Sequence, residues 1–373
     1  MLTTFRASIR GVAAGAALAL GFSATVFAAA QPSQSTVPLH AVLTNFPGVY
    51  AFKQPPANFD PKRASDEELV AWGYPARPGP AEGPREWARW EQQINPALHR
   101  VVPYLARREG IYHGPLQGLK LDAYRSRIYS TAATSSNWSG FALVPPSGAK
   151  AYSSVTADWI LPTVKQAPGT CSGGWDYSSE WVGIGGFSDA FLLQSGSAAD
   201  VFCDIGGNIA EYFPWIEWLP AAELVIYANA QLALLPFVPG DYLIVTVTAT
   251  NWSGGVSKNG TLSFSDVTQG WTASLTFTAA GLGGSEVTGH SAEWIVERTQ
   301  VNGSLATLPD YVADPWWFTR AKDLGAAFHY PGSPGNSTAY QITLLDNSSA
   351  EVSFVDLFGT DALWFFPEGS ATK

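Results

Sequence analysis

The pattern of apolar and polar positions changes near residue 132 of this 373-residue chain. Beyond it, short segments mix apolar with polar residues, often in alternation, and favour β-branched and aromatic types, with Gly, Pro, Asn, Asp and Ser clusters between them. This pattern predicts an all-β sandwich or barrel of antiparallel strands, and 132–373 has the usual size of one β domain. The absence of a long amphipathic helix disfavours an α/β hydrolase. The clearest predicted strands are 151–160, 223–232, 241–249, 261–264 and 271–277.

The stretch before this domain has a different composition. Residues 31–130 contain 13 of the 26 prolines, and 12 Lys and Arg against 9 Asp and Glu give a net charge of +3. Residues 131–373 contain 7 against 22, a net charge of −15. The proline-rich part predicts only short helices, such as 65–72 and 86–93, each with an acidic first turn.

This charge difference suggests a role for the basic stretch. Opposite charges favour binding to the acidic domain at neutral pH, and the attraction weakens as carboxylates become protonated. We therefore predict that 31–131 is a pro-segment that inhibits the domain at 132–373, with the mature chain beginning between 124 and 135. The alternative is an ordinary linker or a small accessory domain.

The N-terminus has the order of features found in secretory signal peptides. Arg6 and Arg10 precede an apolar stretch from Gly11 to Phe27, which runs into Ala28-Ala-Ala30. We predict a signal peptide at 1–30, export of the rest to the extracellular medium, and no membrane association after cleavage. An uncleaved membrane anchor is the alternative reading, but the apolar run is short.

Elimination narrows the chemistry of the domain. It contains only two histidines, His290 and His329, and none of the patterns HExxH, GxSxG, GxxxxGK[ST] or GxGxxG. We therefore expect no metal, no cofactor and no nucleic acid, and acid–base work falls to Asp and Glu, whose pKa near ~4 suits an acidic medium. Cys171 and Cys203 are both in the exported part, so a disulfide between them is plausible, although spacing alone does not prove it.

Six short motifs resemble, in content and order, those of the glutamic peptidases, also called eqolisins. The resemblance is good over about 138–300 and looser to about 365, and 308–334 matches no family motif. Each motif alone is weak, but six in the family's order form a strong resemblance. They are Ser136-Asn-Trp-Ser-Gly140, Val155-Thr-Ala-Asp-Trp-Ile-Leu-Pro162, Glu180-Trp-Val-Gly-Ile-Gly-Gly186, Leu192-Leu-Gln-Ser-Gly196, Trp215-Ile-Glu-Trp-Leu-Pro220 and Ser291-Ala-Glu-Trp-Ile-Val-Glu297.

The resemblance implies a fold and an activity. The fold would be a two-sheet antiparallel sandwich similar to the concanavalin-type jelly roll, with substrate across its concave sheet. The activity would be that of an acid-acting endopeptidase on protein or peptide substrates. Carried over motif by motif, Gln194 and Glu293 would be the catalytic dyad, and Trp138, Trp181 and Glu217 would surround it.

The residue types fit that chemistry. A carboxylate at Glu293 can accept a proton from water as the water attacks the scissile carbonyl, and can then return it to the departing amine. The amide of Gln194 can orient the water and stabilise the oxyanion. The alternative reading of Gln194 is a strand glutamine that satisfies backbone groups.

The strand around Glu293 has a clear alternation. It places Trp294 and Val296 on one face and Glu293, Ile295 and Glu297 on the other. We expect Glu297 to be the solvated or ion-paired end of this strand.

Two other functions remain open from the residues alone. A jelly-roll glycoside hydrolase would use two carboxylates, Glu217 with Glu293 or Glu180 with Glu293. A carbohydrate-binding sandwich would explain the aromatic residues without catalysis. Glu217 follows Trp215, which can line a substrate groove or the edge of the core. We expect the protein to be a monomer.

Overall fold

The computed structural model describes residues 38–367, except 81, 123–129, 169–170, 172, 188 and 205. The predicted signal peptide at 1–30 and part of the predicted start of the mature chain therefore lie outside the described residues. Within the described residues, no helix has the length and apolar character that a membrane span requires.

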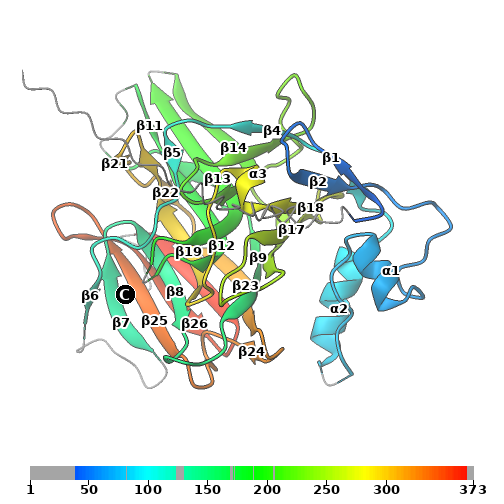
Figure 1. Cartoon of the computed structure of the whole chain (residues 1–373). Helices are drawn as coiled ribbons and strands as arrows, with labels where there is room; N and C mark the ends of the chain where they lie inside the picture. Colours follow the sequence, from blue (N-terminus) through cyan, green and yellow to red (C-terminus); the bar gives the residue numbers. More distant parts are fainter. Residues whose placement is uncertain are drawn as a thin grey trace, which may run out of the picture. The chain divides into compact units, whose positions relative to one another are not determined.

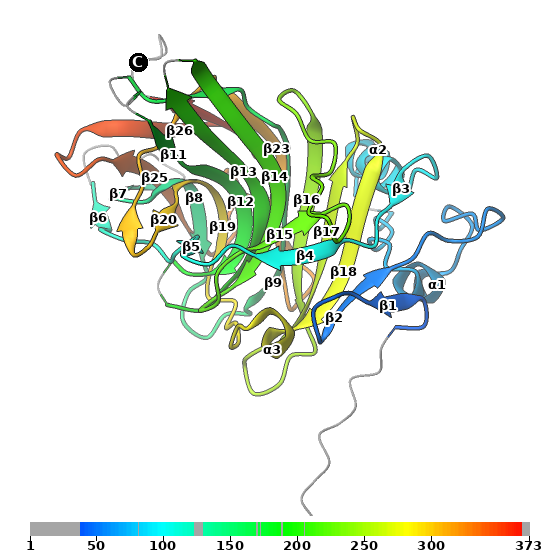
Figure 2. The same cartoon turned by 90° about the horizontal axis from the view of Figure 1, so that it is seen from above.

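Antiparallel strands dominate the structure, as the sequence predicts, and they pack as two layers (Figure 1, Figure 2). The first layer has the order β4 (Tyr104–Arg107), β15 (Leu224–Tyr227), β14 (Gly207–Trp218), β13 (Leu192–Asp204), β12 (Ser178–Gly185), β19 (Ala292–Arg298), β8 (Trp138–Val144) and β25 (Thr338–Leu345). The second has the order β1 (Ala41–Leu43), β2 (Val49–Phe52), β18 (Trp271–Thr278), β17 (Asn259–Asp266), β16 (Tyr242–Thr250), β9 (Tyr152–Ile160), β23 (Asp314–Asp323) and β27 (Ala362–Pro367).

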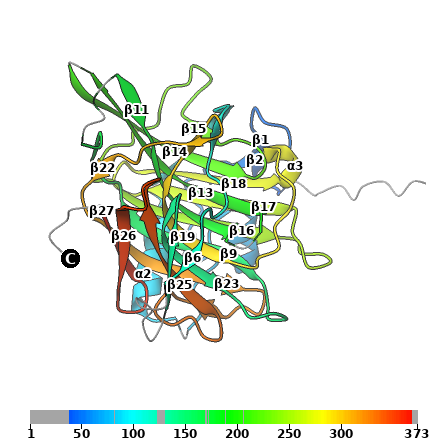
Figure 3. The ribbon, with the colours of Figure 1, turned by 90° about the vertical axis from the view of Figure 1, so that its left-hand side faces the viewer.

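One strand links the two layers. The strand β26 (Glu351–Phe358) pairs with β25 of the first layer and with β27 of the second, and β26 and β27 lie side by side in Figure 3. Two pairs are parallel, β7 (Thr131–Ser135) with β25 and β3 (His99–Arg100) with β18. The remaining short elements are β5 (Ile111–Tyr112), β6 (Lys120–Leu121), β10 (Val164–Lys165), β11 (Gly174–Asp176), β20 (Gln300–Val301), β21 (Ser304–Leu305), β22 (Asp310–Tyr311), β24 (Phe328–His329) and α3 (Ala279–Leu282).

The main core lies between the two layers. Alternate residues of each strand enter it, because successive side chains of a strand point to opposite faces. Trp294 and Val296 of β19 belong to this core, whereas Ile295 belongs to a second apolar cluster on the opposite face of the sheet. The predicted alternation in this strand is therefore confirmed.

Two helices precede the β domain, close to where the sequence predicts them. The helix α1 (Asp66–Ala71) begins at a capping box, in which the Ser65 hydroxyl accepts the N–H of Glu68 and the Glu68 carboxylate accepts the N–H of Ser65. The helix α2 (Pro84–Gln93) begins with proline at its first position.

The stretch 38–122 covers the outer faces of both layers. On the second layer, the buried Arg89 of α2 forms an ion pair with the buried Asp158 of β9, with 2.6 Å between Nη2 and Oδ1. On the first layer, β4 extends the sheet by pairing with β15 (Figure 2). A disulfide joins Cys171 to Cys203 at the end of β13.

Candidate active site

The outer face of the first layer carries a cluster of buried aromatic and polar side chains. We call it the site face. Neighbouring strands bring its members together, because Gln194 of β13 is directly opposite Glu217 of β14 in the strand register. The site face is formed by Trp138, Trp181, Gln194, Trp215, Glu217, Ile295 and Glu297, all of them buried.

Gln194 and Glu217 form one half of the polar network on this face. The Nε2 of Gln194 donates to Glu217 Oε2 at 2.7 Å and to the backbone oxygen of His113 at 2.5 Å. Glu217 Oε2 also accepts the backbone N–H of His113 at 3.0 Å. Burial raises the pKa of Glu217 well above its usual range, and the nearby carboxylates of Glu223 and Glu297 raise it further.

Glu297 forms the other half. Its Oε2 accepts the indole N–H of Trp181 at 2.8 Å, and its Oε1 accepts the side-chain amide of Asn137 at 3.3 Å and the backbone N–H of Gly114 at 3.1 Å. Burial raises the pKa of Glu297 well above its usual range, while these donors oppose that rise because they stabilise the carboxylate. Glu297 is fully buried, so the expectation of a solvated strand end is wrong, whereas the ion-paired alternative is represented by His113, whose Nδ1 is 3.8 Å from Glu297 Oε2.

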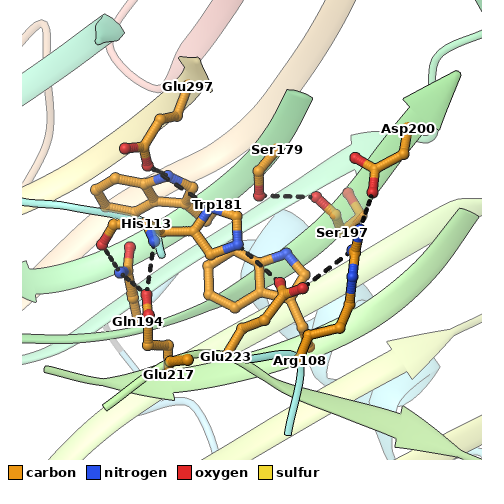
Figure 4. A network of polar contacts seen from close by, with 12 residues as sticks. Arg108, His113, Ser179, Trp181, Gln194, Ser197, Asp200, Glu217, Glu223 and Glu297 are labelled. Atoms are coloured by element: carbon orange, nitrogen blue, oxygen red, sulfur yellow. Dashed lines mark hydrogen bonds and ion pairs between the residues drawn. The ribbon is translucent and has the colours of Figure 1, made fainter. Parts of the chain in front are cut away.

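An extended segment that precedes the β domain occupies the space between these two halves. The carbonyl of the His113–Gly114 peptide bond accepts from Gln194, and the N–H of the same bond donates to Glu297. The carbonyl of Gly114 accepts the indole N–H of Trp138 at 3.1 Å. One backbone peptide group is therefore held at its oxygen by an amide and at its nitrogen by a carboxylate. Figure 4 shows the contact between Gln194 and His113.

The side chain of His113 enters a pocket beside this peptide bond. Its ring stacks on that of Trp215 with centroids 3.9 Å apart, and its Nε2 is 2.8 Å from Glu223 Oε2. Arg108, from the same segment, forms ion pairs with Glu223 Oε1 at 3.0 Å and Asp200 Oδ2 at 2.8 Å (Figure 4). Burial raises the pKa of Asp200 to about 7, although the charge of Arg108 lowers it.

Comparison with known proteins gives the family. A profile of the peptidase A4 family matches residues 136–355. This chain belongs to that family.

Aspergillopepsin-2 of Aspergillus niger is 30% identical over 239 residues, which cover 60% of this chain and 73% of that protein. The crystal structure of aspergilloglutamic peptidase from Aspergillus niger aligns with 52% of this chain and 99% of its own, at 23% identity and a TM-score of 0.40. The chain is therefore a glutamic endopeptidase, and the resemblance seen in the sequence motifs is confirmed.

In this glutamic peptidase the structure does not bring Glu293 together with Gln194. In the strand register, Gly183 of β12 lies between Gln194 of β13 and Glu293 of β19. The side chains of Trp181 and Leu192 cover Gly183 so closely that a Cβ atom there would be 2.8 Å from the Trp181 ring and 2.9 Å from Leu192. These groups fill the space over Gly183. Among the described residues, neither carboxylate oxygen of Glu293 has a hydrogen-bond partner, and burial raises its pKa well above its usual range.

The geometry also disfavours one of the glycosidase pairs considered from the sequence. Glu180 accepts from the hydroxyl of Ser197, and it pairs in register with Val296, which points into the core between the layers. Glu180 and Glu293 therefore lie on opposite faces of the sheet. The pair Glu217 and Glu293 shares a face, but no hydrogen bond connects them.

Several residues of the site are absent from the sequence-based prediction. Asn137 lies in the motif Ser136-Asn-Trp-Ser-Gly140, but the motif does not indicate that its side chain binds a glutamate. Asp200 and Glu223 carry no local signal, because their importance depends on Arg108 and His113, more than 90 positions earlier in the chain. The net positive charge of residues 31–130 is the sequence signal that indicates ion pairs between this stretch and the acidic domain.

Proposed function

We propose that this glutamic peptidase is secreted, acts in acid, is made as a self-blocked precursor and uses Gln194 and Glu297 as its catalytic pair. The observation that carries the proposal is the position of the His113–Gly114 peptide bond. Its oxygen is 2.5 Å from Gln194 Nε2 and its nitrogen is 3.1 Å from Glu297 Oε1. Hydrolysis by an amide and a carboxylate requires the amide N–H at the carbonyl oxygen of the scissile bond and the carboxyl group close to its nitrogen.

Gln194 acts on the carbonyl. Its side-chain N–H already donates to the peptide oxygen, so it is positioned to stabilise the negative charge that develops there when water attacks the carbon. Glu217 accepts the second N–H of the same amide. This contact orients the Gln194 side chain with its donor, rather than its carbonyl, toward the scissile bond. Glu217 is therefore a positioning residue.

Glu297 acts on the proton. As a carboxylate it takes a proton from the attacking water, and its Oε1 is close enough to the peptide nitrogen to return that proton to the departing amine. The C–N bond breaks and the two products are a carboxylic acid and an amine. No covalent intermediate forms, because the nucleophile is water.

Residues 104–118 block this site in the precursor. The segment fills the site with its own backbone, and Arg108 fastens it to Asp200 and Glu223. Because the pKa of Asp200 is raised to about 7, this carboxyl becomes protonated in a mildly acidic medium and its ion pair with Arg108 is lost. Acid therefore loosens the segment and opens the site to water and to protein substrates.

A single acidification experiment tests the proposal. The purified full-length precursor is incubated at pH 7 and at about pH 4, near the carboxyl pKa, and followed by intact mass and by cleavage of denatured casein. We expect the wild type to shorten and to cleave casein only in acid. Gln194→Ala should lose about 10²- to 10³-fold in kcat, because an oxyanion donor is removed.

Gln341→Ala is a matched control, because Gln341 of β25 donates to the backbone oxygen of Val355 and makes no contact with Gln194 or Glu297. It should behave as the wild type. Casein cleavage that survives Gln194→Ala would contradict the dyad and indicate a hydrolase with two carboxylates. A wild type that cleaves nothing in acid would contradict the proposed function.

A further inference from the structure

The segment that fills the site also shows how the protein selects its substrates. This inference rests on the proposed function, in which His113–Gly114 occupies the place of a scissile bond. His113 then stands where a substrate presents the residue before that bond. Its surroundings are the specificity pocket for that residue.

The pocket is built for a flat side chain beside a carboxylate, and burial lowers the pKa of the His113 ring that fills it. The ring of His113 is 1% exposed and stacks on Trp215 with an angle of 17° between the ring planes. Its Nε2 meets a carboxylate oxygen of Glu223, which is fully buried. Aromatic faces and carboxylates both favour cations, and Arg also stacks well on an indole ring.

Arg108 shows that the pocket continues beyond Glu223. Its guanidinium bridges Glu223 and Asp200 and lies over the ring of Phe213 at 4.9 Å. Arg108 and His113 belong to the same segment, so both leave when the segment leaves. Glu223 and Asp200 then lose the groups that contact them and can receive new ones.

We propose that Glu223 and Asp200, together with Trp215, make this peptidase select a basic residue immediately before the scissile bond. Arg is the best side chain, because it is long enough to approach the position of the Arg108 guanidinium and its planar group can bind both carboxylates. Lys follows as a point charge. His reaches Glu223 but not Asp200, as His113 does.

The selection depends on ionised carboxylates, so it changes with pH. The preference for Arg over Leu should increase as the pH rises toward 7, because burial raises the pKa of Asp200 to about 7. The charged and titratable groups that act on Glu223 or on Asp200 are Arg108, His113, Tyr177, Glu180, Glu211, Glu217 and Tyr227. Arg108 and His113 depart with the segment.

The test uses the acid-treated full-length precursor and a series of peptides that differ only before the scissile bond, with Arg, Lys, His, Phe or Leu there. At pH 5 we expect kcat/KM for the Arg peptide to exceed that for the Leu peptide by about tenfold or more, as for a close charge pair. Glu223→Gln should reduce this ratio to within about twofold while the Leu peptide is still cleaved. Glu286→Gln, on a carboxylate that pairs with Lys258 and not with this pocket, is the matched control and should keep the ratio.

Asp200→Asn gives a second, independent test. It should remove the rise in the preference for Arg between pH 5 and pH 7 but leave the preference for His unchanged, because His113 contacts Glu223 and not Asp200. Equal cleavage of the Arg and Leu peptides by the wild type, or an unchanged ratio in Glu223→Gln, would overturn the inference while the proposed function stands. If the wild type cleaves neither these peptides nor casein, the proposed function fails and the inference fails with it.

Discussion

The two ends of β19 carry the same residue type on the same face with different surroundings. Glu293 and Glu297 are both fully buried, and both point away from the core between the layers. Glu297 receives hydrogen bonds from a tryptophan, an asparagine and a backbone amide. Glu293 has no hydrogen-bond partner among the described residues, and Trp181 and Leu192 separate it from Gln194.

This difference shows what makes a buried carboxylate useful for catalysis. Burial raises the pKa of Glu293 well above its usual range, and the Ser291 side chain opposes that rise. Burial raises the pKa of Glu297 as well, but three donors aimed at its oxygens oppose the rise because they stabilise the carboxylate. In the proposed mechanism these donors favour Glu297 over Glu293 as the base beside the peptide bond.

The largest expected effect comes from removing each carboxylate in turn. Glu297→Gln should lower kcat/KM on casein by about 10³-fold or more, because the group that carries the proton is lost. Glu293→Gln should stay within about threefold of the wild type, because a neutral amide replaces a neutral acid of nearly the same shape. Activity of the acid-treated proteins on casein measures both. The reverse result would restore Glu293 as the catalytic residue and refute the comparison.

A smaller effect is expected from the donor that distinguishes the two ends. Trp181→Phe keeps a ring on the site face but removes the N–H that binds Glu297 Oε2. The pKa of Glu297 should rise, so the acid side of the kcat/KM profile should move to higher pH, with activity at pH 4 falling by about tenfold. Kinetics from pH 3 to pH 6 on one peptide give the shift.

The control for Trp181→Phe is the same change at the core tryptophan of β19. Trp294 donates its N–H to the backbone oxygen of Thr156 and points away from the site face. Trp294→Phe should lower stability and leave the pH profile in place. A profile that does not move in Trp181→Phe would mean that the indole N–H does not tune Glu297.

The sequence predicted the fold better than the site, for a physical reason. Strand alternation and helix capping are local, so the strand at 151–160 and the helix that starts after Ser65 could be read from neighbouring residues. The same alternation correctly placed Glu293 and Glu297 on one face. It contained no information about what covers each end of that face.

The covering groups come from distant parts of the chain. Glu297 is set apart by Asn137, Trp181 and Gly114, and the nearest of them in sequence is 116 positions away. The family motifs include both glutamates, and a motif matched by eye does not say which one meets the substrate. The register of β12 with β19 and the path of the segment at 104–118 support the proposal that it is Glu297.

The smallest expected effect is on thermal stability, and it tests the raised pKa of Glu293. Its pKa in the folded protein is raised, so its protonated form stabilises the fold below the unfolded pKa near ~4.3, and that stability is lost as the pH rises toward the folded pKa. Gln does not titrate. In a Gln194→Ala background, which prevents self-digestion, Glu293→Gln should therefore leave Tm unchanged at pH 4 and raise it by roughly 3 °C at pH 8.

Thermal unfolding monitored by circular dichroism gives both Tm values, and Glu211→Gln in the same background is the control for an exposed carboxylate. It should change Tm little at either pH, because substitutions at exposed positions have small effects on stability. A Tm difference for Glu293→Gln that is the same at pH 4 and pH 8 would show that Glu293 keeps an ordinary pKa. The two ends of β19 would then differ in position only, and the lack of donors at Glu293 would have no electrostatic consequence.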